Sequence, residues 1–166
     1  MKLDESIKSS LSSVDSWKKI FSKRKMTWLN MASDSMAPLI PENSSILIKH
    51  IENKEKIGFG DVILFVDGNN LIAHRVLAVQ LKRDRLLQCG DNIISPAFIP
   101  LDSVIGVVVK VKTLDRVTDL DNLSGNIINV AMGVGSLGIL LVKKVWPKGG
   151  NIFNTVRLKF VKWYSK

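Results

Sequence analysis

The sequence predicts a mainly β protein, in which a small coiled antiparallel sheet or barrel carries amphipathic or apolar helices at both ends. Between residues 44 and 112, short runs rich in valine, isoleucine and leucine alternate with turn signals about every ten residues, the spacing of small β folds. At both ends of the chain, apolar residues instead recur every three or four positions, which is the period of a helix. A chain of 166 residues is long enough to bury a core and fits one domain with appendages.

The N-terminal segment, residues 1–30, is predicted to form an amphipathic helix. Its apolar stripe consists of Ile7, Leu11, Val14, Trp17 and Phe21. The segment contains no uninterrupted apolar core, which excludes a signal peptide or a membrane span. The pattern fits both a helix packed on its own domain and a helix lying on a membrane, and the sequence does not decide between them.

Residues 31–115 are predicted to form the β domain. Strands are expected at residues 45–49, 61–66, 71–79, 86–89 and 103–112. The segment Asp67-Gly68-Asn69-Asn70 predicts a hairpin turn between the second and third of these strands, because glycine and asparagine accept positive φ. The sequence therefore predicts short strands joined by tight turns.

The C-terminal segment, residues 116–166, is predicted to hold an apolar helix and a basic amphipathic tail. Residues 122–142 are uncharged, and at about 1.5 Å per residue they are long enough to cross a hydrocarbon core of about 30 Å. Asparagine, serine and glycine dilute this stretch, so a half-buried helix of a soluble domain is the alternative. The apolar side of the tail consists of Ile152, Phe153, Val156, Phe160 and Trp163.

The net charge of +9 is concentrated at the two ends of the chain. Residues 1–30 carry seven Lys or Arg and three Asp or Glu, residues 143–166 carry seven Lys or Arg and no acid, and all four tryptophans lie in these ends. Cations and tryptophan beside apolar helix faces suit the headgroup region of an anionic bilayer. Basic tails also bind nucleic acid, but the helical arrangement of the apolar residues favours a membrane surface as the partner.

No cofactor or metal is expected. The single cysteine, Cys89, excludes an internal disulfide and a cysteine-rich zinc site, and it is expected to be a small buried residue. The two histidines, His50 and His74, lie far apart in the sequence, and no metal-binding motif is visible.

Ser35 and His74 form the candidate catalytic pair. A serine hydroxyl is a poor nucleophile near neutral pH, so it needs a base within hydrogen-bond reach and donors for the oxyanion. Ser35 lies in a predicted loop before the first strand, and Met36 is expected to anchor that loop by burying its side chain. His74 lies on a predicted strand, where its neutral imidazole can accept a proton near physiological pH. Taken alone, each residue also fits a purely structural role.

Five short segments follow one another in a fixed order around this pair. They are residues 33–38 (Ser-Asp-Ser-Met-Ala-Pro), 60–62 (Gly-Asp-Val), 73–76 (Ala-His-Arg-Val), 90–92 (Gly-Asp-Asn) and 104–108 (Val-Ile-Gly-Val-Val). Together they resemble the catalytic body of type I signal peptidases, in the histidine-using form typical of archaea and the endoplasmic reticulum. The resemblance extends over roughly residues 31–112 and not over the two ends.

The resemblance implies a serine endopeptidase that cleaves a signal, leader or precursor peptide after small residues. It implies Ser35 as the nucleophile and His74 as the general base, where the bacterial form uses a lysine. Ser33 matches the residue that often adds a hydroxyl to the oxyanion hole, with the backbone N–H of Ser35 as the second donor.

Two departures from the family pattern affect the site. The family commonly places an acid a few residues beyond the Gly-Asp-Asn turn to orient the histidine, but Pro96 and Ala97 stand there in this chain. Asp91 is the tentative orienting acid, Ser95 is a weaker substitute, and Asp91 also fits a turn residue that bonds its own backbone. Asp34 stands where many members have glycine.

A third departure is that no spanning helix is predicted before Ser35, although signal peptidases usually carry one. The chain is therefore expected to be peripheral at a membrane or anchored through residues 122–142. Two other functions remain: a catalytically weak or inactive peptidase-fold module that binds a membrane or a partner, and a self-cleaving transcriptional regulator, since such regulators share this fold. The regulator is disfavoured because His74 replaces its lysine and residues 1–30 are too short for a helix-turn-helix domain with a linker.

Overall fold

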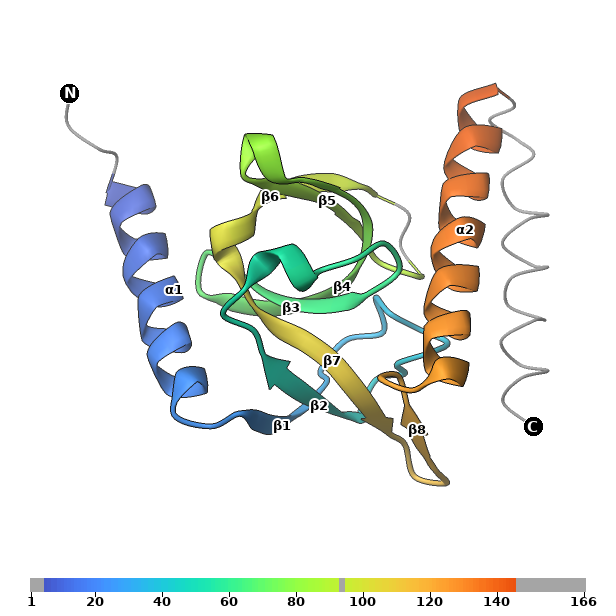
Figure 1. Cartoon of the computed structure of the whole chain (residues 1–166), viewed down its shortest axis with the longest axis horizontal. Helices are drawn as coiled ribbons and strands as arrows, with labels where there is room; N and C mark the ends of the chain where they lie inside the picture. The colour runs from blue at the N-terminus through green and yellow to red at the C-terminus, as the bar shows by residue number, and fades with distance from the viewer. Residues whose placement is uncertain (1–4, 93–94, 146–166) are drawn as a thin grey trace.

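The computed structural model of the chain describes residues 5–92 and 95–145, with side chains from residue 14 to residue 141 (Figure 1). Helix α1 (Glu5–Ser22) precedes an antiparallel sheet, and helix α2 (Leu123–Val145) follows it. The predicted basic tail beyond residue 145 lies outside the described residues, as do the side chains of Ile7 and Leu11.

The sheet has eight strands, and every pair of neighbours is antiparallel. The strands are β1 (Met26–Asn30), β2 (Ser45–His50), β3 (Val62–Asp67), β4 (Asn70–Gln80), β5 (Arg85–Cys89), β6 (Ala97–Pro100), β7 (Val104–Lys112) and β8 (Val117–Asp119). They lie in the order β1-β2-β7-β3-β4-β5-β6, with β8 paired to β7. The sheet curls into a half-barrel (Figure 1), which confirms the mainly β fold with a coiled antiparallel sheet.

The strand β3 is buried on both faces. Val62, Leu64 and Val66 belong to the main core cluster, while Ile63 and Phe65 belong to a second cluster on the opposite face. Because successive strand residues point to opposite faces, an uninterrupted apolar run requires cover on both. The curl of the sheet supplies that cover, and the long valine and isoleucine runs of the sequence follow from it.

The strands predicted in the body of the domain are present as β2, β3, β4, β5 and β7. The predicted hairpin is confirmed, since Asp67 pairs with Asn70 where β3 meets β4, and Gly68 has a φ of 57°. The short strands β1, β6 and β8 were not expected. In the strand order β1 and β6 are the two edges, where side chains stay exposed and apolar alternation is weak. Through β1 the sheet begins at Met26, inside the predicted N-terminal segment.

Helix α1 packs on the sheet. Phe21 is fully buried in the main core cluster, and Val14 and Trp17 pack against the same cluster. The rings of Trp17 and Phe21 contact each other with their centroids 6.3 Å apart. Over its described side chains, the apolar stripe of the helix therefore packs on its own domain.

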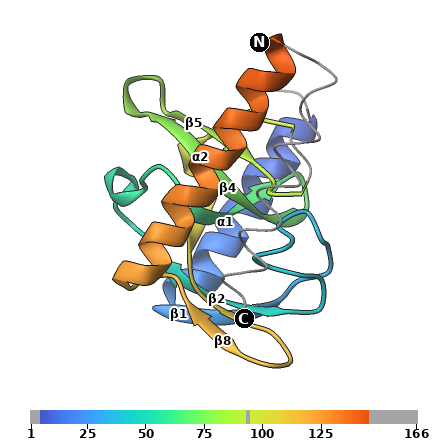
Figure 2. The ribbon, with the colours of Figure 1, turned by 90° about the vertical axis from the view of Figure 1, so that its right-hand side faces the viewer.

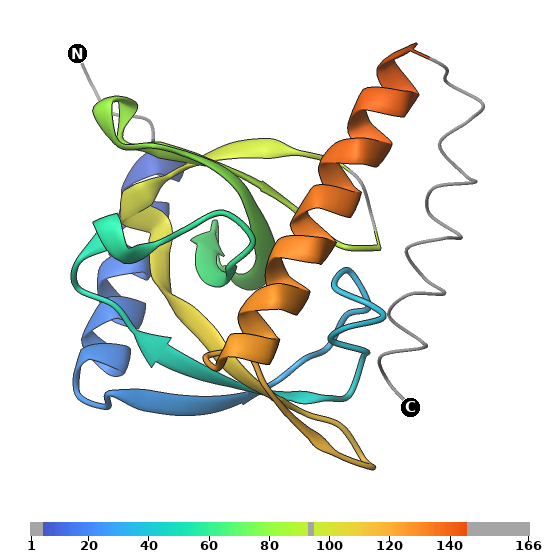
Figure 3. The ribbon, with the colours of Figure 1, turned by 45° about the vertical axis from the view of Figure 1, so that its right-hand side comes forward.

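Helix α2 lies on the side of the molecule opposite α1 (Figure 3) and runs obliquely across the sheet (Figure 2). Its inner face buries Ile128, Met132 and Ile139. Its outer face exposes Leu123, Ile127, Val130, Val134 and Leu141. The 19-residue stretch Leu123–Leu141 is long and apolar enough to cross a membrane, with a mean hydropathy of 1.5, yet 39% of it is buried inside the protein. The helix is thus half-buried against the sheet.

Candidate active site

The predicted nucleophile Ser35 lies in the loop between β1 and β2. Met36 is fully buried in the main core cluster, as predicted, and its side chain anchors the loop. The N–H of Ala37 donates to the carbonyl of Asp34 at 2.8 Å, which closes a turn around Ser35. Ser35 itself is only partly buried, so its hydroxyl sits at the protein surface on a fixed support.

Two possible oxyanion donors lie next to the Ser35 hydroxyl. The Oγ of Ser33 is 3.4 Å from the Oγ of Ser35, and the Ser33 side chain is exposed. Among the residues that the structure describes, none accepts a hydrogen bond from the N–H of Ser35. The structure thus places the Ser33 hydroxyl beside the Ser35 hydroxyl, and the oxyanion role of Ser33 stays a prediction.

Asn92, which the sequence analysis did not single out, holds this loop in place. Its backbone N–H donates to the carbonyl of Ser35 at 2.8 Å, and its side-chain Nδ2 donates to Oδ2 of Asp34 at 3.0 Å. Asp34, which stands where the family pattern has glycine, therefore has a structural role. The carboxylate of Asp34 ties the Ser35 loop to the turn that follows β5.

His74 lies on β4 with one ring nitrogen hydrogen-bonded and the ring packed on Phe65, at a centroid distance of 5.9 Å. Its Nδ1 is 2.5 Å from Oε1 of Gln88 on β5. A carbonyl oxygen can only accept, so Nδ1 carries the hydrogen and the lone pair of the neutral ring is on Nε2. Burial lowers the pKa of His74 below its ordinary 6.5, although the Gln88 bond and the charge of Asp91 oppose that shift. The imidazole is therefore a neutral proton acceptor at pH 7.

Asp91 does not hold the His74 ring, contrary to its tentative assignment as the orienting acid. Its two oxygens accept hydrogen bonds from Nε of Arg75 at 2.8 Å and from Nη2 at 2.7 Å. Both side chains are 0% exposed. A buried guanidinium requires a counter-charge, and both carboxylate oxygens of Asp91 are hydrogen-bonded to Arg75 in meeting this requirement. Asp91 reaches His74 through its charge alone.

Gln88 takes the orienting position instead. In the pairing of β5 with β6, Gln88 lies opposite Ala97, close to where the family pattern places its acid. The partner of the histidine thus comes from the neighbouring strand. Ser95, the other substitute considered, is exposed, and within the described part of the chain no hydrogen bond joins it to His74. The signal for Gln88 was a lone amide beside the apolar residues of β5.

The two members of the candidate pair belong to one connected network. His74 directly precedes Arg75, whose partner Asp91 directly precedes Asn92, the residue bonded to Ser35. In the described residues no hydrogen bond joins the Ser35 hydroxyl to His74. Catalytic hydrogen bonds are often long before substrate binds and tighten only in the complex, so the lack of this bond does not by itself rule out the pair.

The remaining sequence motifs serve the framework. In the Gly-Asp-Val segment, Oδ2 of Asp61 accepts a hydrogen bond from the N–H of Gly58 at 2.8 Å, and burial raises the pKa of Asp61. The carbonyl of Asp61 accepts from the N–H of Val76 at 2.8 Å, which extends the pairing of β3 with β4. Cys89 is fully buried, as expected of a small packing residue.

A separate cleft of about 700 Å³ lies near the C-terminal end of α1 and β2, and neither Ser35 nor His74 lines it. Its lining mixes cations and acids, including the ion pair of Lys49 with Asp121 at 3.1 Å. His50 lines it too, with Nδ1 bonded to the carbonyl of Ile105 at 2.9 Å. In the described residues, no group of three or more His, Cys, Asp or Glu is placed to hold a metal ion.

Comparison with known proteins identifies no family for the chain. No model of a known protein family matches the chain, and a search of curated proteins finds no match.

We predict that His74 is neutral at pH 7 with its proton on Nδ1. In a Gln88→Leu variant the acceptor is lost, so the preference for Nδ1–H should weaken and the pKa of His74 should fall further. Long-range ¹⁵N–¹H NMR of the imidazoles measures both quantities.

His50 is the internal control for this measurement, because its bond to the Ile105 carbonyl does not involve Gln88. Its tautomer should be the same in the wild type and the variant. A wild-type His74 that is charged at pH 7, or that carries its proton on Nε2, would contradict the described site.

Proposed function

We propose that the chain is a serine endopeptidase of the signal peptidase type, with Ser35 as nucleophile and His74 as general base. The observation that carries this proposal is the tautomer of His74, which leaves Nε2 able to accept a proton. A loop serine flanked by a second hydroxyl is the candidate nucleophile. The two lie on segments that Asn92, Asp91 and Arg75 connect by hydrogen bonds. The resemblance of the ordered motifs adds the reaction class.

In the proposed reaction, Nε2 of His74 takes the proton of the Ser35 hydroxyl as Oγ attacks the carbonyl carbon of the scissile peptide bond. The hydroxyl of Ser33 and the N–H of Ser35 donate to the oxyanion that forms. The imidazolium then gives its proton to the leaving amine, and the C–N bond breaks. A water molecule, deprotonated by the same imidazole, hydrolyses the acyl-enzyme and frees Ser35.

Gln88 fixes the tautomer in this scheme but is uncharged. An amide oxygen stabilises the imidazolium less than a carboxylate would. The charge of Asp91 acts on His74 without a hydrogen bond, and Arg75 neutralises much of it. We infer a slower enzyme than one with a full Ser-His-Asp arrangement. The orienting contact of Gln88 favours an active site over the alternative of an inactive binding module.

The substrate class proposed from the resemblance is a signal, leader or precursor peptide cut after a small residue. The test is cleavage of a library of such peptides by wild type, Ser35→Ala and His74→Ala. Each variant should lose at least about 10³-fold in kcat/KM, because nucleophile and base act as one unit. Product masses should locate the cut after small side chains.

The pH profile provides a second readout of the same experiment. Since the base must be neutral, kcat/KM should fall as pH drops through the lowered pKa of His74, below 6.5, and should level off above it. Wild type and both variants cleaving equally slowly would sink the peptidase proposal and leave the binding module. Cleavage of the chain itself would favour the self-cleaving regulator.

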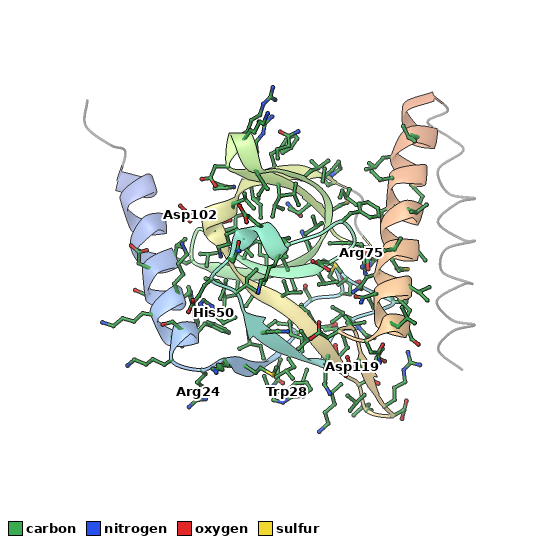
Figure 4. All side chains as sticks on the ribbon, in the orientation of Figure 1. Arg24, Trp28, His50, Arg75, Asp102 and Asp119 are labelled. Atoms are coloured by element: carbon green, nitrogen blue, oxygen red, sulfur yellow. The ribbon has the colours of Figure 1, made fainter. Side chains whose placement is uncertain are left out.

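We also propose that the protein works as a peripheral protein at an anionic membrane surface. At the junction of α1 and β1, a shallow hollow of about 590 Å³ is lined by Ser16, Lys19, Ile20, Lys23, Arg24 and Thr27, with no acid in this lining. Three large apolar side chains are exposed on these two elements: Ile20 (55%) lines the hollow, while Met26 (50%) and Trp28 (46%) lie on the face of β1 opposite to Thr27. Arg24 and Trp28 project from the same edge of the molecule (Figure 4), an arrangement suited to headgroups and the acyl boundary.

This surface, the α1–β1 face, is close to the proposed nucleophile. β1 ends at Asn30, so at most about 17 Å of chain separates it from Ser35. Peripheral attachment also agrees with the half-buried position of α2. The inner face of this helix carries the buried polar residues Asn129 and Ser136. A helix that left the sheet to span a bilayer would carry these groups into lipid.

We predict that reversing two charges on the α1–β1 face weakens binding to anionic vesicles. Each cation near such a surface contributes about 1 kcal/mol, so Lys23→Glu with Arg24→Glu should reduce the partition onto phosphatidylglycerol-containing vesicles by at least about 30-fold. Co-sedimentation measures the partition.

The matched control is Lys82→Glu with Arg83→Glu, a second exposed cation pair in the turn between β4 and β5. It should change binding much less. Equal losses from the two double variants would mean that total charge, and not the α1–β1 face, governs binding.

A further inference from the structure

The guanidinium of Arg75 is held by three separate parts of the chain. Asp91 takes Nε and Nη2, and the carbonyl of Gly60 accepts from Nη1 at 2.7 Å. Nη1 also donates to Oδ1 of Asn129 at 3.1 Å and lies 3.4 Å from the carbonyl oxygen of the same residue. We call these acceptors, from Asp91, Gly60 and Asn129, the cage. Its third part is therefore helix α2, which contributes Asn129.

Because the cage is buried, each of these acceptors is needed to satisfy the N–H groups of the guanidinium. Arg75 and Asp91 are 0% exposed and Asn129 is 4% exposed, so water does not replace a lost partner. A buried guanidinium N–H without an acceptor costs free energy, and it relaxes by shifting its neighbours. Asn129 lies on the buried face of α2, and its side chain completes the cage.

The fit between α2 and the sheet leaves little freedom for this contact to slide. A Cβ placed on Gly60, which has a φ of +90°, would lie 2.8 Å from the carbonyl oxygen of Asn129. One placed on Gly133 would lie 2.8 Å from the ring of Phe59. These two close approaches fix how α2 packs against the segment Phe59-Gly60, and they thereby fix the position of the Asn129 side chain.

The cage lies between the two halves of the proposed catalytic pair. Arg75 is the chain neighbour of His74, and Asp91 is the neighbour of Asn92, whose N–H holds the carbonyl of Ser35 at 2.8 Å. A displacement of the guanidinium therefore moves the strand that carries the base and the turn that holds the nucleophile loop. Misplacing reacting groups by about 1 Å can cost about 100-fold in rate.

We propose that Asn129 is a positioning residue, through which helix α2 sets the geometry of the Ser35–His74 pair by way of Arg75 and Asp91. This inference builds on the proposed peptidase function. It makes α2 part of the catalytic unit, although the helix lies outside the segment over which the family resemblance extends.

The test compares three variants of the full chain. Asn129→Leu keeps the size and removes the acceptor, while Asn129→Asp keeps an acceptor oxygen at the same place. Ser136→Ala is the control, because Ser136 is buried on the same face of α2 and donates to the Met132 carbonyl within the helix at 3.0 Å. Three readouts apply: peptide cleavage, exchange of the Asn92 amide hydrogen, and the NMR signal of the Arg75 Nε–H.

For Asn129→Leu we expect kcat to fall by about 10- to 100-fold with KM within about twofold, because Asn129 is buried and the substitution leaves the protein surface unchanged. The Asn92 amide should exchange at least about tenfold faster, and the Arg75 Nε–H signal should shift. Asn129→Asp should restore most of kcat and of the Asn92 protection. Ser136→Ala should resemble the wild type in all three readouts.

The positioning role would be overturned if Asn129→Leu folded with an unchanged kcat and an unchanged Asn92 exchange rate, or if Ser136→Ala gave the same losses. Should wild type cleave no peptide, the peptidase proposal fails. The exchange rate and the Arg75 signal then still decide whether Asn129 holds the cage.

Discussion

The buried ion pair of Arg75 with Asp91 is the interaction on which the candidate site depends. Burying two charges carries a desolvation penalty on the order of several kcal/mol per ion, and attraction offsets it only when the remaining polar atoms are also satisfied. The two-pronged contact at 2.7 and 2.8 Å, the carbonyl of Gly60 and the side chain of Asn129 meet that condition. The pair thereby joins β4, the turn after β5 and α2 in a single arrangement.

The same pair explains how the site differs from the pattern that its motifs resemble. Because Arg75 claims both oxygens of Asp91, the ring of His74 needs another partner, and Gln88 provides it from the adjacent strand. The Ser35 loop likewise gains a second tie through Asp34, which bonds the side chain of Asn92. Each change in residue type is matched by a contact from a neighbouring segment.

The sequence predicted the secondary structure correctly where burial imposes a regular spacing on the apolar residues. The inner strands were predicted because both of their faces are covered, and the helices because their apolar residues recur every three or four positions. It was insufficient at the sheet edges, where Met26 and Trp28 of β1 are exposed and no apolar pattern marks the strand. An edge strand forms by pairing with its neighbour, so its own sequence does not predict it.

The site followed the same division. Ser35, Ser33 and His74 were proposed from local motifs, and the burial of Met36 was predicted correctly. Gln88 and Asn129 were not, because their roles depend on the register between strands and on how α2 docks. Gln88 carried one signal, since it is the lone amide of its strand and a buried amide must find a partner. Asn129 carried none, because Asn126 lies on the same helix.

The central claim is that the Ser35 hydroxyl is activated as a nucleophile, and its most direct test is to map the adduct of a fluorophosphonate probe by mass spectrometry. The proposed site predicts one phosphonyl group on Oγ of Ser35, formed as fluoride leaves. Its rate of formation should fall sharply in His74→Ala and on denaturation. A native protein that forms no adduct, or that carries the group on another serine, would contradict the account.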